Sequence, residues 1–296
     1  MKVIITIPAY NEAESIGKVV SDIKKNMDNS KYKYSILVID DGSKDGTAET
    51  ARKNGAIVYS HPHNYGLAET FRTGISKCLE SGADIIVHMD ADGQYKADEI
   101  TKLIELIEKK EADLVLGSRF KGTIEEMPLV KRLGNKAFSR VISSIINIRV
   151  SDCQTGFRAF TNEVAKKVNI ISDHTYTQEQ IIRAVREKFR IREVPVYFAR
   201  RKSGRSRLIS NPFQYAVKAW INILRIYRDY EPLKFFWRIG FTFLLFGFGI
   251  GFWLVLLFIT EGKIGHIPST ILSMLLIVVG LQIIIFGFLA DMKSRE

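Results

Sequence analysis

The chain has 296 residues, enough for one large domain or two of ordinary size, and it can bury a sizeable core without disulfide bonds. Its two cysteines, Cys78 and Cys153, lie far apart and belong to no CxxC pair or Cys/His cluster, so we expect reduced structural thiols and no zinc site. The net charge of +11 favours anionic partners: nucleic acid, anionic lipid or phosphorylated substrates.

The first 210 residues alternate strand and helix patterns. The initial apolar run is too short for a signal peptide and reads instead as a buried strand. Between the runs lie helical patterns, one starting near Asn11 and Glu12, one after HNYGLAET and one over residues 97–110. This alternation predicts an α/β fold with an open, largely parallel sheet. The expected strands are VIITIPA (3–9), YSILVID (34–40), AIVYS (56–60), ADIIVHM (83–89) and ADLVLGS (112–118).

Polar motifs follow several of these strands, where ligands bind in open α/β sheets. Asp90 and Asp92 are two residues apart at a strand end, so their side chains are expected to converge. Two close carboxylates are costly unless a charge such as a divalent cation neutralises them, and Gln94 could add an amide oxygen. The motif predicts a metal–diphosphate site, although a lone DxD is weak and a solvated acidic turn is the alternative.

Two more strand ends carry side chains that could meet a nucleoside. Asp40 and Asp41 could accept from a nucleobase N–H or a ribose hydroxyl, or could simply form an Asx turn. Tyr10 could stack on a base, or could be packed in the protein. The stretch 63–66 resembles a polar turn that lets the backbone approach a ligand.

The composition changes near residue 235. Residues 239–260 and 267–290 are uncharged runs of 22 and 24 residues, each long enough to cross a hydrocarbon core of about 20 residues. A buried core helix is the alternative for each run. The short link EGKIGH predicts a transmembrane hairpin, and two spans alone often gain from association, which would give a homo-oligomer. Flanking Lys and Arg residues place both termini and the first 210 residues in the cytoplasm.

The stretch between these parts, residues 211–234, predicts an amphipathic helix. Asn211 can cap it and Pro212 fits its first turn. We expect it to lie at the bilayer surface, with packing on the soluble domain as the alternative. The domains expected are therefore 1–210, soluble; 211–234, juxtamembrane; and 235–296, membrane-spanning.

Seven motifs in order carry a resemblance to a known family. IPAYNE, DDGSKDGT, HNYGLAETFRTGI, DADGQ, GSRF, SDCQTGFRAF and EVPVYFARRKSGRSRL resemble family 2 glycosyltransferases over about residues 1–210. Within that family the likeness is to dolichol-phosphate mannose synthases and polyprenyl-phosphate glycosyltransferases. It implies a GT-A fold, a GDP- or UDP-linked sugar donor, Mg²⁺ or Mn²⁺, inversion at the anomeric carbon, and a polyprenyl or dolichyl phosphate acceptor.

The resemblance also implies residue roles. The acceptor is anionic and needs cations, although generic surface charge explains most Lys and Arg. Lys131 and Asn135 depart from the arginine and serine of dolichol-type enzymes, so either Lys131 or Arg132 could meet the phosphate. The nucleotide would contact Pro8, Tyr10, Glu12, Asp40, Asp41 and Asp90; the metal would lie on Asp90, Asp92 and Gln94; the acceptor phosphate would meet Arg119, Lys131, Arg132 and Asn135; and Asp92, Arg119 and Arg201 would be catalytic.

The acceptor decides the mechanism. A phosphate oxygen needs no base, so positioning and neutralisation of the departing diphosphate would suffice. A hydroxyl acceptor, the second hypothesis, would need a base such as Asp152 or Glu179. These two acids would otherwise support the acceptor site or form salt bridges, for example to Arg158. A membrane-anchored nucleotide-sugar-binding scaffold is the non-enzyme alternative. We expect no nucleic-acid partner, because no aromatic-basic motif accompanies the charge.

Overall fold

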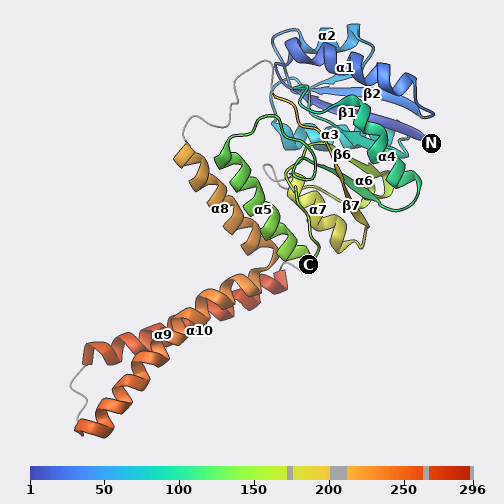
Figure 1. Ribbon diagram of the computed structural model, residues 1–296. Helices are drawn as coiled ribbons and strands as arrows, with labels where there is room; N and C mark the ends of the chain where they lie inside the picture. Colours follow the sequence, from blue (N-terminus) through green and yellow to red (C-terminus); the bar gives the residue numbers. More distant parts are fainter. Residues whose placement is uncertain (172–175, 201–211, 263–266, 294–296) are drawn as a thin grey trace. The chain divides into compact units, whose positions relative to one another are not determined.

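A computed structural model describes residues 1–171, 176–200, 212–262 and 267–293 (Figure 1). The chain forms two compact units, Met1–Pro212 and Phe213–Glu296.

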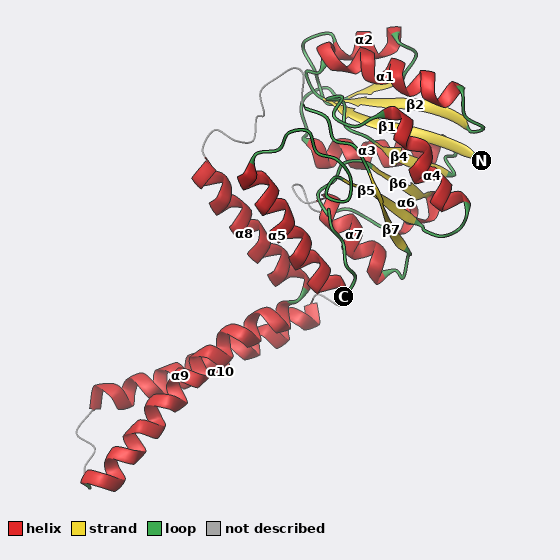
Figure 2. Ribbon diagram, in the orientation of Figure 1, coloured by secondary structure: helices red, strands yellow, loops and turns green. Residues whose placement is uncertain are grey.

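The first unit contains a seven-stranded, mostly parallel sheet of order β3-β2-β1-β4-β6-β5-β7 (Figure 2). Only β6 among the described strands is antiparallel, and it lies between β4 and β5. The α/β fold class predicted from the sequence is confirmed. The strands are β1 (Lys2–Ala9), β2 (Lys33–Asp40), β3 (Ile57–Ser60), β4 (Ile85–His88), β5 (Leu114–Ser118), β6 (Arg158–Thr161) and β7 (Ile191–Pro195).

Helices pack on both faces of this sheet. Apolar residues of α1 and α4 form one core with Val3, Ile5 and Ile7 of β1. On the other face α3 approaches so closely that a Cβ on Gly74 would lie 2.7 Å from Oγ1 of Thr6. The helices of this unit are α1 (Ala13–Asp28), α2 (Thr47–Lys53), α3 (Leu67–Glu80), the short 3₁₀ turn η1 (Ala97–Glu99), α4 (Ile100–Glu108), α5 (Leu129–Ile146), α6 (Asn162–Lys167) and α7 (Tyr176–Arg186).

The register of the central strands brings their carboxyl ends to one edge. Ala9 is paired with Asp40 in β1 and β2, and Thr6 is paired with His88 in β1 and β4. The loops that follow these strands therefore meet at this edge, as expected for a ligand site in a parallel sheet.

Both cysteines are buried and form no disulfide, and burial raises the pKa of each thiol to about 12. The expectation of structural thiols is confirmed.

The second unit contains α8 (Pro212–Tyr230), α9 (Pro232–Glu261) and α10 (Ile267–Lys293). Within the described residues, α9 and α10 are long and apolar enough to cross a bilayer. They pack closely: a Cβ on Gly240 would lie 2.6 Å from the carbonyl oxygen of Gly280, and Oγ of Ser273 donates to the carbonyl of Gly247 at 2.7 Å. Only 11% and 22% of their most apolar windows are buried, unlike core helices of soluble proteins.

Candidate functional site

The loops after β1 and β2 are hydrogen-bonded to each other. Asn11, at φ 52°, donates from its backbone to Oγ of Ser43 at 2.9 Å, and its side-chain oxygen accepts from the backbone of Lys44 at 2.9 Å. The backbone N–H of Glu12 donates to Oγ1 of Thr47 at 2.9 Å. The two strand ends singled out in the sequence thus form one framework.

Three side chains proposed to contact a nucleoside lie at or beside this framework. Pro8 is buried near the end of β1, whereas Tyr10 and Glu12 are partly exposed just beyond it. Oε2 of Glu12 accepts from Oγ of Ser15 at 2.9 Å. The structure therefore places Tyr10 and Glu12 at the carboxyl edge of the sheet, and their contact with a nucleoside stays a prediction.

The two acids at the end of β2 are both buried but have different partners. Oδ1 of Asp40 accepts from the backbone of Ser43 at 3.1 Å. Asp41 accepts from Nδ1 of His61 at 2.8 Å and from the backbone N–H groups of Tyr65 and Gly66 at 2.9 Å each. Asp41 therefore holds the 61–66 turn in place, a role that the sequence did not reveal.

The acid pair after β4 lies at the same edge. Asp90 and Asp92 are both partly exposed. Burial and the charge of Asp92 raise the pKa of Asp90 to about 7, while the charges of Arg119, Arg158 and Lys131 oppose that rise. The two carboxylates thus lie close enough to repel each other, as expected from their spacing. Such a pair is stabilised by a cation.

Gln94 is oriented by the segment that precedes residue 201. The side-chain Nε2 of Gln94 donates to the backbone carbonyl of Ala199 at 3.0 Å. The backbone carbonyl of Gln94 accepts from the backbone N–H of Ala199 at 2.8 Å. Because the amide nitrogen is used in this way, the side-chain oxygen points elsewhere. That orientation suits the predicted role of Gln94 as an oxygen donor.

The residues fit a hard divalent cation that is only partly enclosed by protein. Within the described residues, no group of three or more His, Cys, Asp or Glu side chains is gathered in a way that could hold a metal. Asp90 and Asp92 with the amide oxygen of Gln94 offer few, all-oxygen ligands. Mg²⁺ is held in this way, through one or two carboxylates with water and phosphate oxygens completing its shell.

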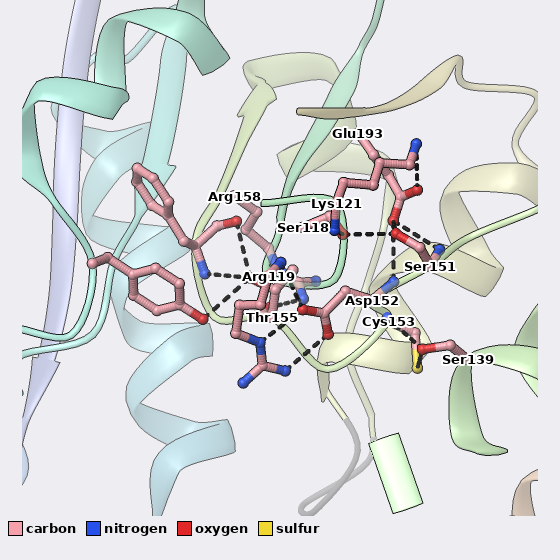
Figure 3. Close-up of polar contacts among 12 residues, drawn as sticks. Ser118, Arg119, Lys121, Ser139, Ser151, Asp152, Cys153, Thr155, Arg158 and Glu193 are labelled. Carbon is pink, nitrogen blue, oxygen red and sulfur yellow. Dashed lines mark hydrogen bonds and ion pairs between the residues drawn. The ribbon is translucent and has the colours of Figure 1, made fainter. Parts of the chain in front are cut away.

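Arg119 and Asp152 form a buried, bidentate ion pair beside this site (Figure 3). Nε of Arg119 lies 2.7 Å from Oδ2 of Asp152, and Nη2 lies 2.8 Å from Oδ1. Arg119 is 5% exposed and Asp152 is 0% exposed. The sequence left a salt bridge as one alternative for Asp152. The structure shows that salt bridge, with Arg119 rather than with Arg158.

Arg158 is among the largest fully buried side chains of the protein, and it donates hydrogen bonds to neutral acceptors. It donates to the carbonyl of Thr177 at 3.0 Å and to Oε1 of Gln180 at 2.9 Å, and also to the carbonyl of Thr155. Its positive charge therefore remains available to act on Asp90 through the protein interior.

Helix α5 brings one of two candidate cations toward the acid pair. The charge of Lys131 opposes the rise in the pKa of Asp90, and Lys131 is partly exposed, whereas Arg132 is exposed. Asn135, one turn further along α5, is buried. Lys131 therefore lies near enough for its charge to act on Asp90, and which of the two cations meets an acceptor stays a prediction.

Two further predicted residues have other positions. Glu179 is buried on α7, where Oε1 accepts from Nε of Arg183 at 2.7 Å and both oxygens accept from the backbone of Ile171. It is bound to its own helix and the preceding segment. Arg201 lies outside the described residues.

Comparisons with known proteins agree on one family. Residues 4–168 match the model described as Glycosyl transferase family 2. The UDP-N-acetylglucosamine–dolichyl-phosphate N-acetylglucosaminyltransferase of Methanococcus voltae is 34% identical over 217 residues, covering 65% of this chain and 83% of that protein. The dolichyl-phosphate hexose transferase of Haloferax volcanii is 31% identical over 210 residues, covering 71% and 86%.

A solved structure shares the fold. Glucosyl-3-phosphoglycerate synthase from Mycobacterium tuberculosis, in complex with Mn²⁺, UDP and glucosyl-3-phosphoglycerate, superposes with a TM-score of 0.60 at 16% identity, covering 75% of this chain and 79% of that chain. The predicted GT-A architecture is confirmed. Because the family model matches more than half of the sequence, this chain belongs to glycosyltransferase family 2.

Proposed function

We propose that the protein transfers one sugar, with inversion, from a nucleotide sugar to a polyprenyl or dolichyl phosphate. The observation that carries this proposal is that Asp90 and Arg119 meet the same loop: a Cβ on Gly156 would lie 2.6 Å from the Asp90 carboxylate, and Asp152 of that loop binds Arg119. The charges of Asp92, Arg119 and Lys131 all act on Asp90. The carboxylates of Asp90 and Asp92 suit a metal-bound diphosphate, and the cations Arg119 and Lys131 suit a second anion. Similar proteins are named as dolichyl-phosphate, polyprenol or undecaprenyl-phosphate sugar transferases.

On the donor side, Tyr10, Glu12 and Asp40 would contact the nucleoside beside Pro8. Asp90, Asp92 and Gln94 would hold Mg²⁺ or Mn²⁺. The ion would supply positive charge to the departing nucleoside diphosphate. The protein itself positions the two carboxylates, one of them closely covered by the backbone of Gly156.

On the acceptor side, Arg119 and Lys131 would bind the lipid phosphate, with Asn135, Arg132 and Arg201 as further candidates. The pairing of Arg119 with Asp152 uses two of the five N–H donors of the guanidinium, so three remain for a phosphate. A phosphate oxygen is already nucleophilic and no proton has to be removed. This suits a site in which Asp152 is fully buried on Arg119 and Glu179 is bound to Arg183.

The proposal includes a membrane arrangement. Helices α9 and α10 would cross the bilayer, with residues 1–210 and both termini in the cytoplasm, as the Lys and Arg residues flanking the spans indicate. Helix α8 would lie on the bilayer surface, and Trp220 on it is 62% exposed. Self-association would use the lipid-facing sides of the hairpin.

A donor panel tests the proposed function. Membranes containing the protein would be incubated with polyprenyl phosphate, Mg²⁺ and a panel of radiolabelled GDP- and UDP-sugars. We expect one donor to give a labelled lipid-phosphate sugar that control membranes do not form. No labelled lipid across the full panel would contradict the proposal.

Gly156→Ala tests the position of Asp90. A Cβ at residue 156 would lie 2.6 Å from both carboxylate oxygens of Asp90, closer than real contacts allow. We expect transfer to fall about a hundredfold, the usual effect of displacing a reacting group by about 1 Å. The readouts are kcat/KM and Mn²⁺ affinity.

The matched control is Gly249→Ala in α9, where an added Cβ meets nothing within 4 Å. This variant is expected to retain the activity of the unmodified protein. If Gly156→Ala retained full activity and metal affinity as well, Asp90 would not need its observed position.

A further inference from the structure

The orientation of Arg119 depends on a single carboxylate. Two guanidinium nitrogens and the backbone N–H of Arg119, the last at 3.1 Å, all donate to Asp152. Both side chains are buried, so the direction in which the guanidinium points follows that of the Asp152 carboxylate. Whatever fixes Asp152 therefore fixes Arg119.

Asp152 is in turn held by Glu193 of β7 (Figure 3). A single oxygen, Oε1 of Glu193, accepts from the backbone and the hydroxyl of Ser151 at 2.9 Å each and from the backbone of Asp152 at 3.1 Å. The Glu193 side chain is only 4% exposed. A buried carboxylate is costly unless donors surround it, and here the donors come from the loop that carries Asp152.

The second oxygen of Glu193 reaches the loop that carries Arg119. Oε2 forms an ion pair with Nζ of Lys121 at 2.9 Å. The backbone of Lys121 donates to Oγ of Ser118 at 3.2 Å, and that hydroxyl lies 2.6 Å from Oγ of Ser151. Glu193 thus ties the loop of Arg119 and the loop of Asp152 to one strand.

The same loop anchors α5, which carries Lys131. Oγ of Ser139 accepts from the backbone of Cys153 at 3.1 Å, and Oγ of Ser143 accepts from the backbone of Val150 at 2.9 Å. Residues 150–153 are therefore a common support for both cations on the acceptor side.

We propose that Glu193 is a positioning residue: through Asp152 it sets the orientation in which Arg119 meets an anionic acceptor. This rests on the proposed function, which gives Arg119 the acceptor phosphate. Glu193 touches no substrate itself. A strand position that only had to pack would be filled at lower cost by an apolar side chain.

Glu193→Gln tests the proposal in the full-length protein. The amide keeps the shape of the side chain, but its NH₂ group replaces one of the two acceptor oxygens. That NH₂ must face either the ammonium of Lys121 or the N–H groups of residues 151–152, so one of these donors loses its acceptor. We expect the Kd for farnesyl phosphate and the acceptor KM to rise about tenfold, the effect of losing one charged hydrogen bond. The Kd values for UDP and GDP with Mn²⁺ should stay within about twofold.

Asp113→Asn is the matched control. Asp113 also accepts two guanidinium hydrogen bonds, from Arg190 at 3.0 and 2.8 Å. Asp113 and Arg190 directly precede β5 and β7, whereas Arg119 directly follows β5, at the other end of that strand. The Asp113→Asn variant is expected to leave both binding constants and the acceptor KM unchanged.

The outcomes separate this proposal from the proposed function. Equal behaviour of Glu193→Gln and Asp113→Asn would overturn the positioning role, and so would a parallel loss of nucleotide binding, which indicates general misfolding. If farnesyl phosphate bound to the unmodified protein and no donor were used, the proposed function would fail, while the farnesyl phosphate Kd would still decide the role of Glu193. Failure of the unmodified protein to bind farnesyl phosphate would contradict both.

Discussion

Replacing Asp92 with asparagine is expected to lower sugar transfer about a thousandfold while the protein remains folded. Asp90 and Asp92 are close enough that Asp92 raises the pKa of Asp90, so a shared cation would be held by both. Asparagine removes one charge from that pair and weakens the positive charge placed on the leaving diphosphate, a contribution worth several kcal/mol. The measurement is nucleotide release and lipid product at saturating donor and Mn²⁺.

Asp98→Asn is the matched control, because Asp98 is an exposed acid in the 3₁₀ turn that follows the DxD loop. It should retain the turnover of the unmodified protein. Equal turnover in the Asp92→Asn variant would rule out a catalytic metal at this pair. No turnover even in the unmodified protein, with nucleotide still bound, would favour the scaffold alternative.

Replacing Asp152 with alanine is expected to cost about 3–5 kcal/mol in the free energy of unfolding, because it leaves the guanidinium of Arg119 buried without its partner. For a domain of this size that corresponds to a fall of roughly 6–20 °C in the apparent midpoint of thermal unfolding. Transfer should fall too, because Arg119 loses the group that orients it.

The comparison is Asp113→Ala, which breaks an ion pair of the same geometry whose arginine is 55% exposed. Its cost should be about 0–1 kcal/mol, as for other surface pairs. If both variants unfolded at the same temperature, the buried pair of Arg119 and Asp152 would have no special stabilising role. Full acceptor affinity in Asp152→Ala would separate Asp152 from acceptor binding.

The parallel part of the sheet could be predicted because its strands are continuous apolar runs that end in polar motifs. All five expected strands are present, and the third, β3, is a largely exposed edge strand. Strand β6 is only RAFT, four residues including a charged one, so no alternating pattern marks it. Its antiparallel pairing with β4 and β5 depends on contacts far apart in the sequence.

The site could be predicted in its residue types but not in its pairings. The sequence predicts that Asp90 and Asp92 converge, but β4 ends at His88, so both acids lie in the turn that follows the strand and strand alternation is not the reason for their closeness. The partner of Asp152 does not follow from the sequence, because Arg119 is 33 residues away and Arg158 is nearer in sequence. The choice between Lys131 and Arg132 depends on the direction in which α5 presents its residues, which sequence spacing alone does not determine.

Two residues belong to the quoted motifs, but the sequence assigned them no role of their own. Gly156 matters because the Asp90 carboxylate occupies the place of its missing Cβ. Glu193 lies in β7, whose sequence IREVP also contains Arg192, so nothing in the sequence shows that this acid is enclosed. Its meaning depends on Ser151 and Asp152, which are brought to it only by the fold.

The central claim is that the acceptor attacks through a phosphate oxygen and needs no base. The most direct measurement compares polyprenyl phosphate with the corresponding polyprenol, using the same donor and Mg²⁺. We predict that only the phosphate is glycosylated and that the sugar is released from the product by phosphodiester cleavage. Labelling of the free polyprenol at a similar rate would contradict the claim.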